Sequence, residues 1–155
     1  MSQRTPLILP YPALCLVTDR SYTPTQHLPE KVAQAVEGGV NIVQLRENDL
    51  PAGQLLALAT AIRDVTQGKA MFDVNDRVDI ALAAGADGVQ LGEEGIPLKA
   101  ARIIAGQQLL IGRSIHSIEG AREAQALGAD FLVAGTIFTT VSKPKAQPTG
   151  LAMLA

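Results

Sequence analysis

The strongest constraint on the fold is a pattern that occurs three times along the chain. Each copy joins the end of an Ala-rich stretch to a glycine and then to an apolar run: AVEGGVNIVQL (35–45), ALAAGADGVQL (81–91) and AQALGADFLVAG (124–135). Glycine adopts the left-handed backbone conformation that commonly ends a helix, so Gly39, Gly85 and Gly128 mark helix ends. Each copy therefore predicts a helix followed at once by a buried strand, and the repetition predicts strands that alternate with helices.

The segments between these copies extend the same alternation. Further strands are expected at 13–19, 70–76 and 109–114, with helices in the remaining stretches. The strands are continuous apolar runs, which is typical of a parallel sheet buried on both faces by helices. An open doubly wound sheet and a (β/α)₈ barrel both have these properties. No G-x-G-x-x-G motif follows the first strand, and its absence argues against a dinucleotide-binding sheet.

The length of the chain favours a barrel that stops short. Six strand–helix units occupy 155 residues, whereas a complete barrel usually needs about 250 residues and rarely fewer than 200. We therefore predict an α/β fold, a (β/α)₈ TIM barrel truncated after about six β/α units. Residues 1–155 would form a single domain that lacks strands 7 and 8, and the final PTGLAMLA would begin a sixth helix.

Composition excludes several other classes of protein. A net charge of −2 and an aromatic content of 3% argue against a nucleic-acid partner. No apolar run approaches the roughly 18 residues that a membrane span needs, and the N-terminus lacks the features of a signal peptide. We therefore expect a cytoplasmic protein without a membrane partner. The single Cys15 excludes an intramolecular disulfide, and its place within an apolar strand predicts a core position.

Polar residues gather where the predicted strands end, which is where parallel α/β folds bind their ligands. In chain order these candidates are Gln44, Arg46, Asn75, Asp76, Glu93, Glu94, Ser114, His116, Thr140, Ser142 and Lys143. Cations, amides and hydroxyls dominate the set. Such groups suit a small anionic, phosphorylated molecule.

Structural explanations for some of these residues stay open at this point. Asn75 and Asp76 could cap the helix that follows them. Arg46 could pair with the neighbouring Glu47 at an exposed strand end, and His116 could cap the fifth helix. Glu93 and Glu94 are adjacent glutamates near the start of a helix. Such glutamates often interact favourably with the helix dipole and need not bind a metal.

Five segments together resemble the thiamine-phosphate-synthase/TenI family: VTDR, GGVNIVQLREND, VNDRVDIALAAGADGVQLGEEGIP, IGRSIHS and GADFLVAGTIFTTVSK. Their order and spacing make the resemblance specific, and it runs from about residue 14 to the C-terminus. Synthases of this family join a hydroxymethylpyrimidine pyrophosphate to a thiazole phosphate, using magnesium. TenI-like members instead shift a double bond in a thiazole carboxylate phosphate.

The resemblance implies a role for most of the candidates. In a synthase, Gln44, Arg46, Asn75 and Lys143 would hold the pyrimidine and pyrophosphate, Asp76 would bind Mg²⁺, and Thr140 and Ser142 would face the thiazole phosphate. In a TenI-like protein, His116, framed by Ser114, would transfer the proton. Imidazole suits that role because its pKa lies near neutral.

Two departures from the synthase pattern decide our preference, together with the segments NDRVDIAL, VQL and GRSIHS, which resemble TenI-like proteins more closely. Asn48 stands where synthases have a lysine, which removes a cation for pyrophosphate. Gly95 stands where they have a carboxylate, which removes a metal ligand, although Glu93 or Glu94 could substitute for it. We therefore favour a thiazole tautomerase that acts through His116 on a phosphorylated thiazole without a cofactor.

Two alternatives to this reading remain. The first is a Mg²⁺-dependent thiamine-phosphate synthase that also takes the pyrimidine pyrophosphate. The second is an inactive truncated barrel or a non-catalytic module that binds a phosphorylated ligand. Association into a homo-oligomer is left open.

Overall fold

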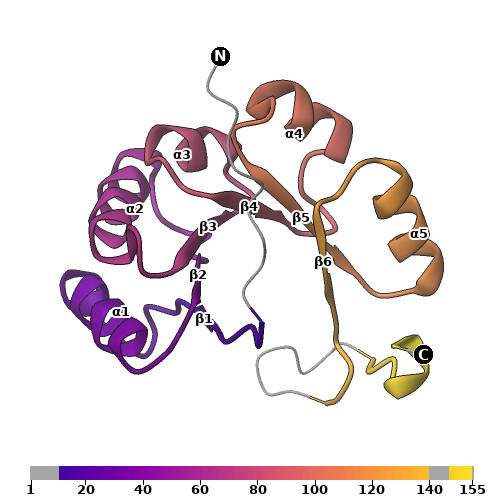
Figure 1. Ribbon diagram of the computed structural model, residues 1–155, viewed down its shortest axis with the longest axis horizontal. Coiled ribbons are helices and arrows are strands. Elements are labelled where there is room, and N and C mark those ends of the chain that lie inside the picture. Colours follow the sequence, from indigo (N-terminus) through magenta and orange to yellow (C-terminus); the bar gives the residue numbers. More distant parts are fainter. Residues whose placement is uncertain (1–10, 140–146, 155) are drawn as a thin grey trace.

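The computed structural model describes residues 11–139 and 147–154. Figure 1 shows a curled sheet whose strands line the centre and whose helices cover the outside. The elements in chain order are β1 (Cys15–Val17), η1 (Thr25–His27), α1 (Leu28–Glu37), β2 (Ile42–Leu45), α2 (Ala52–Thr66), β3 (Met71–Asn75), α3 (Val78–Ala83), β4 (Gly88–Leu91), α4 (Leu98–Ala105), β5 (Leu110–Ile115), α5 (Ile118–Ala126), β6 (Phe131–Ala134) and η2 (Leu151–Met153).

The sheet confirms the predicted class, a (β/α) barrel truncated after six strands. Every strand pairs in parallel with the next, in the order β1-β2-β3-β4-β5-β6. Within residues 11–139 and 147–154, no further strand pairs with the outer edge of β1 or of β6. Instead of a sixth α-helix, the described residues 147–154 form only the short 3₁₀ turn η2. That residues 1–155 form a single domain lacking strands 7 and 8 stays a prediction.

The apolar core lies between the sheet and the helices. Phe72, Val89 and Ile111 come from three neighbouring strands, and each is fully buried on the helix side. Cys15, by contrast, is exposed, so its expected core position is wrong. It lies on β1, an edge strand whose side chains have a neighbouring strand on one side only among the described residues.

The repeated sequence pattern has a structural counterpart two residues after each glycine. Asp87 Oδ2 accepts a hydrogen bond of 2.9 Å from the backbone N–H of Phe72 and lies 2.8 Å from Arg63 Nη1. The carboxylate therefore ties the beginning of β4 to the beginning of β3 and to helix α2. Asp87 therefore accepts a hydrogen bond from the buried backbone N–H of Phe72 and also pairs with the partly buried guanidinium of Arg63.

The other two copies place a polar side chain at the same point. Asp130 Oδ2 accepts the N–H of Ile111 at 2.7 Å and pairs with Arg102 Nη2 at 2.6 Å. Asn41 Oδ1 accepts the N–H of Leu14 at 2.8 Å. Each unit is thus fastened to the strand before it by the same hydrogen bond.

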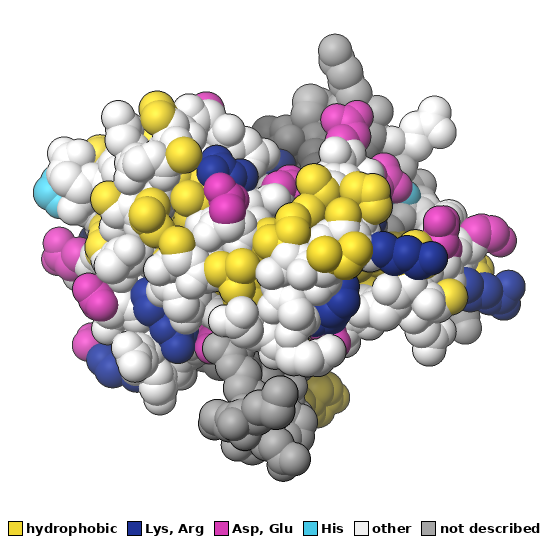
Figure 2. All heavy atoms as spheres, turned by 90° about the horizontal axis from the view of Figure 1, so that it is seen from above, with side chains coloured by type: hydrophobic (Ala, Val, Ile, Leu, Met, Phe, Trp, Pro, Cys, Tyr) yellow, Lys and Arg dark blue, Asp and Glu magenta, His cyan; other side chains and the backbone are white. Residues whose placement is uncertain are grey.

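The outer surface carries apolar side chains as well as charged ones. Helix α4 lies at the top of Figure 1 and exposes Ile103 (83%) and Ile104 (52%). Figure 2, seen from that side, shows apolar side chains gathered beside lysines and arginines. Among the described residues, no helix combines the length and the apolar character needed to cross a membrane.

Candidate functional site

The inner face of the curled sheet is polar near the carboxyl ends of the middle strands. Residues two apart on a strand share a face, and the residues that alternate with the buried core therefore point inward. Strand register places Gln44 beside Asp73, Asn75 beside Gln90, and Gln90 beside Gly112. The register thus places Gln44 and Asn75, which the sequence analysis identified, beside Asp73 and Gln90, which it did not.

Hydrogen bonds fix the orientation of these amides. Gln90 Nε2 donates to Ser114 Oγ at 3.1 Å. Gly112 permits this arrangement, because a Cβ there would collide with Gln90 Oε1. Asn75 Nδ2 donates to Asn48 Oδ1 at 3.1 Å, so Asn48 orients an amide of the site where a lysine would have supplied charge.

Arg46 is an available cation at the mouth of this face. Glu47, its proposed partner, instead accepts a 3.0 Å hydrogen bond from Arg20 Nε, and the side chain of Arg46 is exposed. The pKa of the Asp19 carboxyl lies below its ordinary value, mainly because the hydroxyl and backbone N–H of Ser21 donate to it, with a smaller contribution from Arg46. The guanidinium can therefore still meet an anionic ligand.

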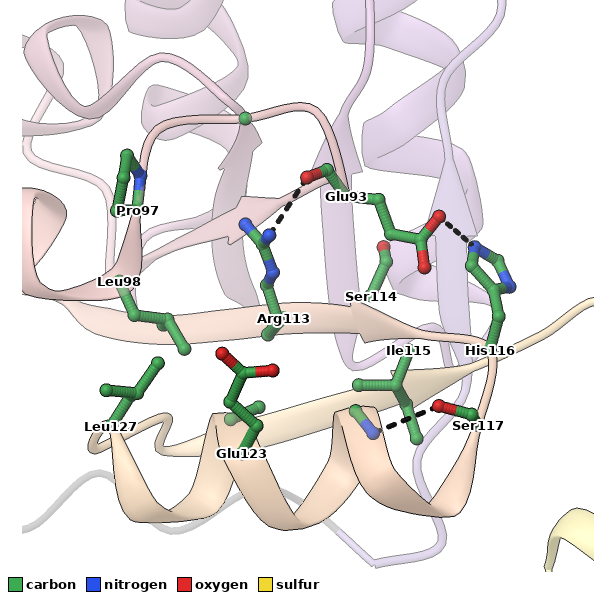
Figure 3. Close-up of a pocket in the computed structure, with 13 residues that line it drawn as sticks. Glu93, Pro97, Leu98, Arg113, Ser114, Ile115, His116, Ser117, Glu123 and Leu127 are labelled. Atoms are coloured by element: carbon green, nitrogen blue, oxygen red, sulfur yellow. Dashed lines mark hydrogen bonds and ion pairs between the residues drawn. The ribbon is translucent and has the colours of Figure 1, made fainter.

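His116 faces a cavity of about 370 Å³ between the β4–α4 turn, β5 and α5 (Figure 3). Its Nε2 lies 3.5 Å from Glu93 Oε2, and the close-up shows the two side chains pointing toward one another. Ser117 caps α5, accepting the N–H of Gly120 at 3.0 Å. His116 is therefore not the helix cap, and an imidazole beside a carboxylate is suited to holding or moving a proton.

Asp76 is held against the β4–α4 turn. Its Oδ1 accepts the N–H of Gly92 at 2.7 Å, and its Oδ2 accepts Asn75 Nδ2 at 2.8 Å. A Cβ added at Gly95 would lie 2.5 Å from Asp76 Oδ1. The missing side chain at position 95 therefore provides the space that the Asp76 carboxylate occupies.

The expected magnesium ligands do not form a cluster of their own. Glu93 lies beside His116, and no group of three or more His, Cys, Asp or Glu side chains that could hold a metal occurs in the part of the chain that the structure describes. Mg²⁺ is often held by one or two carboxylates together with substrate phosphates. The residues present fit only a site of that kind, in which Asp76 is one ligand and a phosphorylated substrate supplies others.

Two buried polar residues of the inner face escaped sequence reasoning. Asp73 and Gln90 are each 3% exposed, and burial raises the pKa of Asp73 to about 7, opposed by a hydrogen bond from Gln44. A carboxylate inside the apolar run MFDVN was the available signal. Thr140, Ser142 and Lys143 lie outside the described residues, and the roles of all these side chains stay predictions.

Comparison with known proteins adds independent information. The family described as thiamine monophosphate synthase matches residues 14–155. A thiamine-phosphate synthase of Gloeobacter violaceus is 48% identical over 130 residues, 83% of this chain and 38% of that protein. One from Syntrophomonas wolfei is 43% identical over 145 residues, 92% of this chain and 69% of that protein.

A solved structure gives the same result in three dimensions. Thiamine phosphate pyrophosphorylase from Pyrococcus furiosus superposes with a TM-score of 0.83 at 41% identity, covering 92% of this chain and 67% of that one. The chain thus spans about two thirds of the length of that structure and of the Syntrophomonas protein.

These names favour the synthase, which the sequence analysis kept as its alternative, and give no specific support to the tautomerase. The preference for a tautomerase rested partly on Asn48 and Gly95, and both have structural roles here: Asn48 orients Asn75, and Gly95 accommodates Asp76. By the extent of the family match and of these identities, the chain belongs to the thiamine monophosphate synthase family, a family of enzymes of thiamine biosynthesis.

Proposed function

We propose that the protein carrying this chain is a thiamine-phosphate synthase. It would join hydroxymethylpyrimidine pyrophosphate to thiazole phosphate and release pyrophosphate. The observation that carries the proposal is an inner face of amides and a hydroxyl with the exposed cation Arg46 at its mouth. The names of the relatives support the same activity.

The chemistry requires little more than orientation and charge. The bond between the pyrimidine methylene carbon and a pyrophosphate oxygen breaks, and its electron pair leaves with pyrophosphate. A carbon–nitrogen bond to the thiazole then forms. Arg46 would stabilise the charge that develops on the leaving group, while Gln44, Asn75 and Ser114 would orient the pyrimidine. Mg²⁺, held by Asp76 and the pyrophosphate oxygens, would neutralise further charge.

Replacing Arg46 with alanine tests this role. Because a charge-assisted contact to the leaving group would be lost, we expect kcat/KM for coupling to fall about 30- to 100-fold. The assay follows thiamine phosphate formed by the full chain from both substrates with Mg²⁺. Arg122→Ala, an exposed arginine on α5 away from this face, is the matched control and should retain full activity.

The same assay separates the two family activities. Isomerisation of thiazole carboxylate phosphate without any coupling would overturn the synthase in favour of the tautomerase. Loss of that isomerisation in His116→Ala would then assign the proton transfer to His116.

Metal binding provides a second prediction, at Gly95. An aspartate at this position would displace the Asp76 carboxylate from the turn and place two carboxylates together. We expect Gly95→Asp to bind Mn²⁺ at least about tenfold more tightly than the unaltered chain when no pyrophosphate is present. Electron paramagnetic resonance titration measures this directly.

Gly95→Asn is the control, because it fills the same space without adding a charge. The unaltered chain should bind Mn²⁺ well only when pyrophosphate is added. Tight Mn²⁺ binding by the unaltered chain alone would contradict a site that the substrate completes.

A further inference from the structure

Arg20 follows β1, and the chain itself engages each nitrogen of its guanidinium. Nε donates to Glu47 Oε2 at 3.0 Å, Nη2 lies 2.6 Å from Asp49 Oδ1, and Nη1 donates to Thr25 Oγ1 at 3.4 Å. The Arg20 side chain is 23% exposed and that of Glu47 only 5%. A guanidinium has five N–H donors and no acceptor, so these contacts leave little of Arg20 for an anionic ligand. Arg20 is therefore suited to holding two parts of the chain together.

The contacts of Arg20 join the segment after β1 to the segment after β2. Both carboxylates lie in the β2–α2 loop. A further hydrogen bond reinforces the connection, because Thr18 Oγ1 accepts the backbone N–H of Arg46 at 3.0 Å. Thr18 is only 3% exposed, so water competes little for this bond. The end of β2 is thus fixed at residue 46 by Thr18 and at residue 47 by Arg20.

The side chain of Arg46 lies between these two points of attachment. Leu45 is buried, Arg46 is exposed and Glu47 is buried, which is the pattern of an extended chain whose successive side chains point to opposite sides. Glu47 therefore holds the strand end in place, while Arg46 projects from it at the mouth of the inner face. A catalytic group displaced by about 1 Å can lose on the order of 100-fold in rate, so this attachment bears on what Arg46 can do.

We propose that Arg20 is a positioning residue for the coupling reaction, and that it acts through Glu47 and Asp49 on the strand end that carries Arg46. The inference rests on the proposed function, in which Arg46 stabilises the charge on the departing pyrophosphate. Arg20 would touch neither substrate. Because Arg46 acts on charge that develops in the transition state, loss of Arg20 should lower kcat and leave KM nearly unchanged.

A double-mutant cycle on the full chain tests the proposal. It compares kcat for coupling, with both substrates and Mg²⁺, in the unaltered chain, Arg20→Ala, Arg46→Ala and the double variant. We expect Arg20→Ala to lower kcat about 5- to 20-fold, with KM for hydroxymethylpyrimidine pyrophosphate changed less than about twofold. In the Arg46→Ala background the same replacement should lower kcat less than about twofold, because the group that Arg20 positions is gone.

Three further variants separate positioning from charge and from stability. Asp49→Ala removes a side chain that is 79% exposed, and it should lower kcat about 2- to 5-fold with the same non-additivity. Arg20→Lys keeps the charge but loses the fork that spans two carboxylates, so it should recover only part of kcat. Arg102→Ala breaks an ion pair of the same 2.6 Å length near the opposite end of the sheet. It should lower the melting temperature and leave kcat unchanged.

Three results would overturn the inference while coupling by the unaltered chain keeps the proposed function. They are an equal fold-loss of kcat on removing Arg20 with and without Arg46, full kcat in folded Arg20→Ala, and full recovery in Arg20→Lys. Thermal melts followed by circular dichroism establish that each variant is folded. If Arg20→Ala does not fold, Asp49→Ala decides, and an additive loss or no loss of kcat there would overturn the inference.

Failure of the proposed function gives a different result. If the unaltered chain couples no substrates, the proposed function fails and the inference fails with it. If the unaltered chain couples but Arg46→Ala retains full kcat, the role of Arg46 is wrong, and Arg20 has no catalytic group to position.

Discussion

Replacing Asp87 with alanine is expected to lower the free energy of unfolding by about 3 kcal/mol. The Asp87 side chain is 18% exposed and that of Arg63 is 20% exposed, so the variant leaves a partly buried guanidinium without its carboxylate. It also leaves the N–H of Phe72, a fully buried core residue, without an acceptor. Urea denaturation followed by circular dichroism measures the change, since the chain has no tryptophan.

The repeat supplies an internal control for this prediction. Asp130 makes the same two contacts, but its side chain is 36% exposed, and Arg102 also donates to the carbonyls of Gly106 and Leu109. Asp130→Ala should therefore cost about half as much. A loss below about 1 kcal/mol for Asp87→Ala, or a larger loss for Asp130→Ala, would contradict the explanation.

These aspartates show how far sequence reasoning reaches. The glycines and apolar runs predicted the alternation of strands and helices, because helix ends and buried strands are local features. The partner of Asp87 lies 24 residues away on α2, and no local pattern specifies that pairing. The sequence therefore revealed the repeat, and only the structure revealed the contact between Asp87 and Arg63.

The candidate site was also predicted only in part. Asn75, Ser114 and His116 were identified because polar residues at strand ends are conspicuous. Asp73 and Gln90 were missed because they lie inside strands, where only the register shows that they share the inner face.

Gly95 illustrates a different limit of sequence reasoning. Comparison with the synthase pattern indicated a lost metal ligand at position 95, whereas the structure shows that the Asp76 carboxylate occupies the space left by this glycine. Which side chain uses the room left by a glycine is decided by tertiary contacts.

Asp73 also predicts an unusual dependence of stability on pH. Burial raises its pKa from 3.8 to about 7, so the native state binds more protons than the unfolded state between these pH values. Stability from this group is then fully present below pH 3.8 and is lost as the pH rises through 7. Between pH 4 and pH 8, we expect the unaltered chain to lose roughly 4 kcal/mol relative to Asp73→Asn.

The difference between the two proteins isolates this carboxyl, because every other titrating group is common to both and cancels. The Cys15 thiol faces Asp73, but its pKa of about 11 lies outside the range tested. A flat difference between pH 4 and pH 8, or one that grows in favour of the unaltered chain, would mean that Asp73 is ionised and stabilised in the native state. A hydrogen-bond donor from elsewhere in the protein would then have to lie beside this carboxylate.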